Sequence, residues 1–71
     1  MKKDIKKYTI SVYSENVAGL LGKVAQIFTR RKINLDSLTT SESEIKGIHR
    51  FTIVVHETKA TVQKVVLQIE K

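Results

Sequence analysis

The sequence contains no cysteine, no proline and no tryptophan, and it has three glycines. Without cysteine the chain cannot form a disulfide bond, a thiolate zinc site or an iron–sulfur cluster, and it has no cysteine nucleophile. No apolar run approaches the ~18 residues of a membrane-spanning helix, and no signal-peptide core follows the basic start. We therefore expect a soluble, cytoplasmic domain that does not bind a membrane.

Length and charge narrow the class of protein further. The 71 residues suffice for one domain with a thin core, because a chain this short buries only about 60% of its unfolded surface. The net charge of +6 makes nucleic acid a partner to test. The cations gather in a basic lead-in at residues 1–4, which continues to Lys7, and near Arg30 and Arg31. A solvated tail and a helix end stabilised by its dipole account for both groups.

Two hydrophobic periods predict the secondary structure. Alternating apolar residues predict strands over 5–13, 33–40 and 48–56, and a 3.6-residue period predicts helices over 18–32 and 58–71. In the second strand, alternation places Leu35 and Leu38 on opposite faces. The first helix carries one apolar stripe, formed by Leu20, Leu21, Val24, Ile27 and Phe28.

The order strand–helix–strand–strand–helix is that of a ferredoxin-like βαββαβ unit without its last strand. Two helices on one face of an antiparallel sheet make a two-layer α+β sandwich. In the usual strand order 4-1-3-2, the outer edge of the first strand is then exposed. We expect either that the chain is part of a longer protein or that another chain covers this edge.

Catalytic constellations are missing from the sequence. His49 and His56 are seven residues apart in one expected strand, so they lie on opposite faces and cannot share a metal ion or an acid–base role. We find no serine placed as an activated nucleophile and no close carboxylate pair. We expect no catalytic residue, no metal site and no cofactor, and we interpret both histidines as surface residues.

An RNA-recognition motif shares the same element order and is therefore an alternative. Its third strand needs aromatic residues that stack on bases. The segment that begins with Lys46 and Gly47 has Ile48, Arg50 and Ile53 at those aromatic positions. The sequence therefore favours a domain that does not bind nucleic acid.

The start of the first helix is a candidate binding site. Asn16 is placed to cap the helix, and Gly19 follows three residues later. Unpaired N–H groups at a helix N-terminus favour an anion such as a carboxylate, and a glycine lets a ligand or a second backbone approach closely. An ordinary capped helix without a ligand explains the same spacing, and the pattern alone leaves both interpretations open.

Two stretches carry a family resemblance. The segment 16–21, Asn-Val-Ala-Gly-Leu-Leu, resembles the N-x-x-G-x-L signature of ACT domains, which are small regulatory modules that bind amino acids. The segment 34–39, Asn-Leu-Asp-Ser-Leu-Thr, resembles the N-[IL]-[ED]-S-L-T stretch of the small regulatory subunit of acetolactate synthase, also called acetohydroxyacid synthase. The resemblance runs from Tyr8 to Lys71, within a single ACT domain over 1–71. The chain departs from the family at Ala18, where many ACT domains have proline, and in having no fourth strand or C-terminal domain.

The resemblance implies a non-catalytic regulatory module of a thiamine-diphosphate-dependent acetolactate synthase, whose catalytic large subunit would be the partner. It implies valine feedback control of branched-chain amino-acid synthesis. The alternatives are an ACT-type sensor of another amino acid on a different enzyme and, less favoured, a basic RNA-binding domain.

The resemblance also implies a homodimer, paired side by side at the second strand, with the effector bound between protomers. N–H groups near Ala18, Gly19 and Leu20 would bind its carboxylate, and Asn16 with the neighbouring protomer's Asn34 would hold its ammonium or carboxylate group. The full set of expected effector-binding residues is Asn16, Val17, Ala18, Gly19, Leu20, Leu21, Asn34 and Leu35, in which Leu21 and Leu35 line the side-chain pocket.

Overall fold

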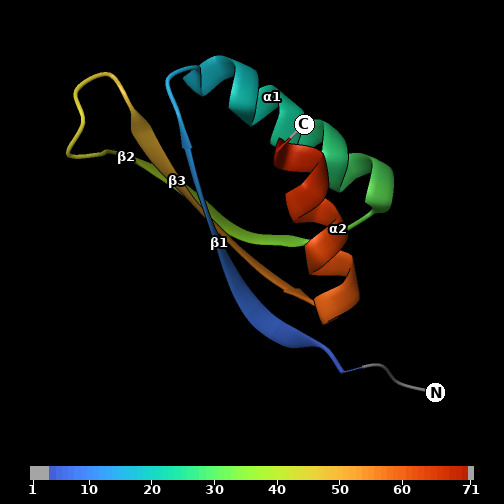
Figure 1. The fold of residues 1–71 in the computed structure, drawn as a ribbon. Coiled ribbons are helices and arrows are strands. Elements are labelled where there is room, and N and C mark those ends of the chain that lie inside the picture. The colour runs from blue at the N-terminus through green and yellow to red at the C-terminus, as the bar shows by residue number, and fades with distance from the viewer. Residues whose placement is uncertain (1–3, 71) are drawn as a thin grey trace.

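The computed structural model describes residues 4–70 and contains five elements in the predicted order (Figure 1). They are β1 (Lys6–Ser14), α1 (Val17–Arg31), β2 (Leu35–Glu42), β3 (His49–Glu57) and α2 (Lys59–Glu70). Most of the predicted lead-in at 1–4, and the predicted helix end at Lys71, lie outside the described residues.

The three strands form one antiparallel sheet with the order β1-β3-β2, and both helices cover the same face of it (Figure 1). This arrangement confirms the two-layer α+β sandwich and the ferredoxin-like strand order. Among residues 4–70, no strand pairs with the outer edge of β1 or with that of β2. Both edges therefore present unpaired backbone N–H and C=O groups.

The core lies between the helices and the inner face of the sheet. β3 is the central strand, and its alternate residues Phe51, Ile53 and Val55 are at most 2% exposed. The predicted stripe of α1 faces them, with Leu21 at its half-buried border. Burial of each such side chain contributes roughly 1.5–3 kcal/mol. The buried side chains are Ile10, Leu20, Val24, Ile27, Phe28, Ile33, Phe51, Ile53, Val55, Val62, Val65 and Ile69.

The second strand begins at Leu35, not at residue 33 as the alternation predicted. Lys32 adopts the left-handed conformation, with φ 55° and ψ 44°, and its N–H donates to the Thr29 carbonyl at 3.2 Å. The Ile33 N–H donates to the Phe28 carbonyl at 3.0 Å, which completes a Schellman motif. Ile33 is consequently 8% exposed and belongs to the end of the helix, where it packs in the core.

The prediction that Leu35 and Leu38 lie on opposite faces of the sheet is wrong, because β2 contains a local irregularity. Leu35 pairs with Val55 and Leu38 pairs with Ile53, and both partners point toward the helices. A register shift between Leu35 and Ser37 inserts one extra residue, Asp36, as in a β-bulge. The extra residue reverses the alternation, so both leucines lie on the inner face.

The remaining boundaries shift by one or two residues. β2 continues through Ser41 and Glu42, two residues past the predicted end at residue 40, and the turn that follows contains Gly47 at φ +87°. At the start of α2, the Thr61 N–H donates to Thr58 Oγ1 at 3.2 Å. Thr58 therefore caps this helix.

Candidate functional site

The connection between β1 and α1 is a short, exposed turn held by its own side chains. The Asn16 N–H donates to Ser14 Oγ at 3.0 Å, and Asn16 Oδ1 accepts a hydrogen bond from the Gly19 N–H at 2.9 Å. The Leu20 N–H donates to the Asn16 carbonyl at 3.0 Å. Asn16 therefore caps the helix as the sequence predicted.

This capping decides which donors remain for a ligand. Gly19 and Leu20, two of the three expected N–H donors, already donate to Asn16. Among the described residues no group accepts a hydrogen bond from the N–H of Val17 or Ala18, or from Asn16 Nδ2. The first turn also carries no acidic side chain to neutralise the positive end of the helix dipole. The turn thus offers three donors to an anion.

The helix cap, and not the approach of a ligand, explains the glycine at position 19. A Cβ built on Gly19 would lie 2.4 Å from Asn16 Nδ2 and 2.8 Å from Asn16 Cγ. Real Cβ atoms do not approach other atoms so closely, so a side chain at Gly19 would displace the capping amide. A Cβ at Gly22, one turn further along, would have no neighbour within 4 Å outside the adjacent residues and the backbone of its own helix. The glycine at position 19 is required by the cap itself.

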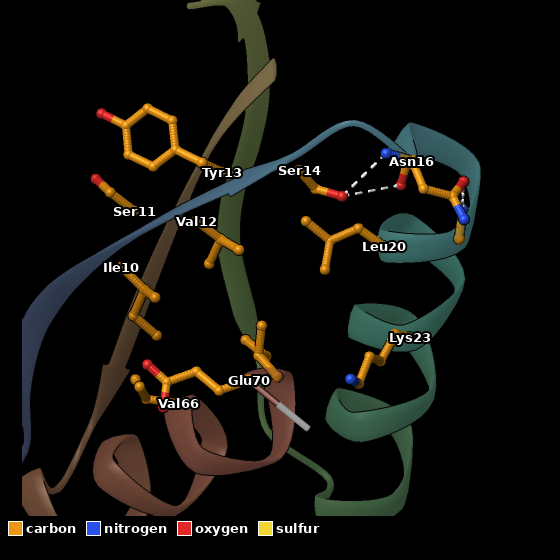
Figure 2. A pocket seen from close by; sticks show the side chains of 12 residues that line it. Ile10, Ser11, Val12, Tyr13, Ser14, Asn16, Leu20, Lys23, Val66 and Glu70 are labelled. Atoms are coloured by element: carbon orange, nitrogen blue, oxygen red, sulfur yellow. Dashed lines mark hydrogen bonds between the residues drawn. The ribbon is translucent and has the colours of Figure 1, made fainter. Parts of the chain in front are cut away.

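A cavity of about 620 Å³ opens beside this turn, between β1, the first half of α1 and the end of α2 (Figure 2). Of the predicted site residues, Asn16, Gly19 and Leu20 line it. Val17, Ala18 and Leu21 lie outside it. The full lining is Ile10, Ser11, Val12, Tyr13, Ser14, Asn16, Gly19, Leu20, Lys23, Val66, Ile69 and Glu70.

Asn34 and Leu35 lie at the opposite end of α1 from Asn16. The helix has 15 residues, and at 1.5 Å per residue its ends are about 21 Å apart. Asn34 is exposed, and Leu35, at the free edge of β2, is 38% exposed. One protomer therefore does not bring the two asparagines together, and a site that uses both needs two chains.

Two charged residues of the cavity, Lys23 and Glu70, were not among the site residues predicted from the sequence. Lys23 lies four residues after Gly19, which is the spacing that places two side chains on the same helix face. That spacing was an available signal. Glu70 reaches the cavity because α2 ends beside β1, which is a tertiary relation without a local signature.

The histidines behave as predicted with respect to the sheet. His49 shares the inner side of β3 with Phe51, and His56 lies on the outer side, where its Nδ1 contacts the carboxylate of Asp36. His49 Nδ1 is buried and has no hydrogen-bond partner among the described residues. Over residues 4–70 no group of three potential metal ligands occurs, and no described helix is long and apolar enough to cross a membrane.

Comparison with known proteins gives a consistent result. The family model described as an AHAS small subunit-like ACT domain matches residues 10–71. A probable acetolactate synthase small subunit from Archaeoglobus fulgidus is 42% identical over 65 residues, which cover 92% of this chain and 41% of that protein. The acetolactate synthase small subunit 2, chloroplastic, of Arabidopsis thaliana is 37% identical over 94% of this chain and 14% of its own length.

Solved structures extend the comparison. The crystal structure of the acetolactate synthase small subunit from Thermotoga maritima matches with a TM-score of 0.76 and 34% identity, over 90% of this chain and 40% of that one. A putative glycine cleavage system transcriptional repressor matches with a TM-score of 0.65 at 20% identity, which is a likeness of fold alone. The chain thus spans about two fifths of the length of the first of these relatives, 41% for the A. fulgidus protein.

Proposed function

Because the chain belongs to the family of AHAS small subunit-like ACT domains, we propose that it is a regulatory module of acetolactate synthase. Its relatives are small subunits of that enzyme, so the catalytic steps belong to a thiamine-diphosphate-dependent large subunit, and this chain is its non-catalytic partner. The effector is a branched-chain amino acid, valine, bound between two copies of the domain. Binding shifts the quaternary arrangement and so regulates the first step of branched-chain amino-acid synthesis.

The observation that carries this proposal is the open start of α1. The free N–H groups of Val17 and Ala18 and the Nδ2 group of Asn16 are three donors at the positive end of a helix dipole. A carboxylate has the acceptors and the charge to match them. Asn16 Oδ1 already accepts from the Gly19 N–H, and Asn16 Nδ2 is a donor without an acceptor among the described residues, so we assign Asn16 to the carboxylate of the effector.

In this proposal the second chain binds the ammonium group of the effector. When two β2 strands pair antiparallel across a two-fold axis, the start of one lies beside the end of the other. The end of β2 lies at the same end of the protomer as the start of α1, because β1 and β2 both run toward that end of the sheet. The partner's Asn34 and Leu35 are thereby brought toward the open turn, and the Asn34 side-chain oxygen accepts from the ammonium group.

Calorimetry with valine, leucine and isoleucine, together with sedimentation, tests this proposal. We expect a dimer at micromolar concentration and binding of valine with one site per chain. Asn34→Ala should weaken binding by roughly 1.5–3 kcal/mol, the range for a hydrogen bond to a charged group, with little effect on folding because Asn34 is exposed.

Asn34→Asp is the matched variant. It keeps the oxygen that accepts from the ammonium group, so binding should survive or strengthen. Equal valine binding by wild type and Asn34→Ala would show that the site is assigned wrongly. A stable monomer would contradict the two-chain site, and binding of an unrelated amino acid alone would favour the alternative sensor.

The partnership with the large subunit has its own test. The chain should co-purify with an acetolactate synthase large subunit, and valine should alter the amount retained or the inhibition of that subunit. Retention without any valine effect would separate the partner from the effector. The absence of retention would contradict the proposed partnership.

A further inference from the structure

Positive charge in this protein is concentrated in the helical layer. α1 and α2 together contain five lysine or arginine residues and one acidic residue, Glu70. The rest of residues 4–70 contains six acidic and five basic residues. The outer surface of the helices lies away from the free edge of β1, which is the place of the fourth strand in a ferredoxin-like fold (Figure 1).

Helix dipoles explain only part of this charge. Arg30 and Arg31 lie in the last turn of α1, where the dipole favours cations. In α2 the order is reversed, because Lys59 is its first residue, Glu70 is its last, and its last turn has no basic residue. A cation at the positive end of a helix dipole is unfavourable, and so is an anion at the negative end. The charges of α2 therefore do not serve the stability of that helix.

A groove between the two helices holds the arginines in place. Arg31 Nε donates to Gln68 Oε1 at 2.7 Å, which joins α1 to α2 and leaves the two terminal nitrogens of the guanidinium group without an acceptor among the described residues. Gln26, Ile27 and Arg30 complete the lining of this helix groove, whose volume is about 250 Å³. Neither arginine forms an ion pair within residues 4–70. The helix groove therefore presents two unpaired guanidinium groups to solvent.

Beside the helix groove, α2 exposes an apolar side chain. Leu67 is 60% exposed, and it lies three residues after Lys64, on the same face of α2. A protein surface can supply carboxylates for the cations and an apolar group for the leucine together. We propose that the outer surface of α1 and α2 is a docking site for an acidic surface of another protein.

The exposed groups define what this partner presents. One carboxylate binds between Arg30 and Arg31, because a guanidinium group can donate two parallel hydrogen bonds to a carboxylate. A second acidic side chain meets Lys64, and an apolar side chain covers Leu67. Arginine is enriched at protein interfaces, since its planar group binds carboxylates and is more weakly hydrated than an ammonium group.

Nucleic acid fits this surface less well. Proteins that bind single-stranded nucleic acid stack its bases on exposed aromatic side chains. Phe28 is the one aromatic residue of α1 and α2, and it is 5% exposed in the core. A phosphate backbone also offers nothing to cover Leu67, because its contacts are made with cations. The exposed residues therefore favour an acidic protein surface.

Fluorescence anisotropy with a labelled acidic peptide tests the proposal. The probe is a ten-residue peptide that contains four glutamates and two leucines in a background of alanine. A control peptide has glutamine in place of every glutamate. We expect the control to bind at least tenfold more weakly than the probe, and the affinity of the probe to fall as salt is added, because salt screens exposed charges.

A matched pair of charge reversals locates the site, measured at about 0.15 M salt so that distant charges are screened. Arg30→Glu changes the helix groove and should weaken the probe at least tenfold. Lys46→Glu makes the same change of net charge in the exposed turn between β2 and β3, and it should alter the affinity less than twofold. Leu67→Ser should weaken the probe about two- to fivefold through lost apolar burial. Thermal unfolding of the three variants checks that they fold.

Four results would overturn the proposal. No binding of the probe at high micromolar concentration and low salt would exclude the docking site. Equal effects of Arg30→Glu and Lys46→Glu would mean that the probe responds to net charge alone. Tighter binding of a ten-nucleotide oligouridine than of the probe would assign the surface to nucleic acid. Complete displacement of the probe by inorganic phosphate at constant ionic strength would assign the helix groove to a small anion.

The docking surface and the proposed effector site have separate readouts. Peptide binding is measured without valine, and valine calorimetry is measured without the peptide. Failure of the peptide experiment therefore leaves the effector site standing, and failure of valine binding leaves the docking surface standing.

Discussion

The two ends of α1 differ in whether the protein satisfies their backbone hydrogen-bonding groups. At the end of the helix, Lys32 and Ile33 satisfy the last carbonyl groups through a Schellman motif, and Ile33 is buried with Phe28. At the start, Asn16 satisfies Gly19 and Leu20, but the N–H groups of Val17 and Ala18 have no described acceptor. One end is closed by the protein, and the other is left open to solvent.

This contrast separates stability from binding within one helix. A closed, apolar end contributes to folding through burial and cannot accept a ligand. An open end with free donors is less stable by itself, and it becomes fully satisfied when an anion binds. We therefore expect changes at the closed end to alter unfolding, and changes at the open end to alter effector binding.

The largest expected effect is at the closed end. Phe28→Ala removes a side chain that is 5% exposed and should cost about 3–5 kcal/mol. Global stability for a chain of 71 residues is about 4–10 kcal/mol, so the variant should lose at least about a third of it. Leu21→Ala, at the half-buried border near the open end, is the control and should cost less than half as much. Urea denaturation followed by circular dichroism measures both, and equal costs would remove the contrast between the two ends.

Asn16 offers a test in which binding and folding separate. Asn16→Asp keeps an oxygen that caps Gly19 and adds a charge that the helix dipole favours, so stability should be unchanged or slightly higher. The same change removes Nδ2 and places a negative charge against the effector carboxylate, so affinity should fall by at least about 1.5–3 kcal/mol.

Asn16→Ala is the complementary variant. It removes both the cap and the donor, so it should lose affinity and about 1 kcal/mol of stability as well. Calorimetry with valine and urea denaturation of the same samples give the two readouts. Wild-type valine affinity in Asn16→Asp would show that the carboxylate does not bind at the start of α1.

The sequence predicted those features that depend on local patterns. The order of elements, the stripe of α1 and the Asn16 cap follow from hydrophobic period and from the chemistry of short polar side chains. The predicted effector-binding residues, which rest on family resemblance, stay predictions. The structure adds that Asn16 and Asn34 lie at opposite ends of one helix, so they can act together only across two chains.

The errors arose where tertiary geometry overrides a local period. Ile33 continues the alternation of a strand, but the left-handed conformation of Lys32 turns it into the core. Leu38 lies on the inner face because the bulge at Asp36 changes the phase of β2. Glu70 lines the cavity beside the β1–α1 turn because α2 and β1 end close together in space. None of these three features has a signature in neighbouring residues.

A pair of glycine variants sharpens the account of the open end. Gly22→Ala adds a methyl group in open space and should stabilise the helix by about 0.5–1 kcal/mol through helix propensity. Gly19→Ala has the same intrinsic gain, but its Cβ displaces the Asn16 side chain and so loses the cap. It should be less stable than Gly22→Ala by about 0.5–2 kcal/mol, the range for loss of an N-cap. Equal midpoints in urea for the two variants would mean that the cap contributes nothing to stability.

The smallest expected effect is also at the closed end of α1, and it is a gain of stability where Phe28→Ala gives a loss. Lys32 is the one non-glycine residue with positive φ among residues 4–70, and a side chain in the left-handed region costs roughly 1–2 kcal/mol. Glycine adopts this conformation without that cost but loses more entropy on folding, so Lys32→Gly should stabilise the chain by about 0.5–1 kcal/mol. Lys32→Ala keeps the strain and removes the charge that favours the helix C-terminus, so it should be neutral or slightly destabilising. The measurement is a shift of the urea midpoint at constant slope. Equal stabilisation by Lys32→Ala and Lys32→Gly would show that the left-handed conformation of Lys32 is not a source of strain. The gain would then come from removing one of the 13 cationic side chains of a chain whose net charge is +6.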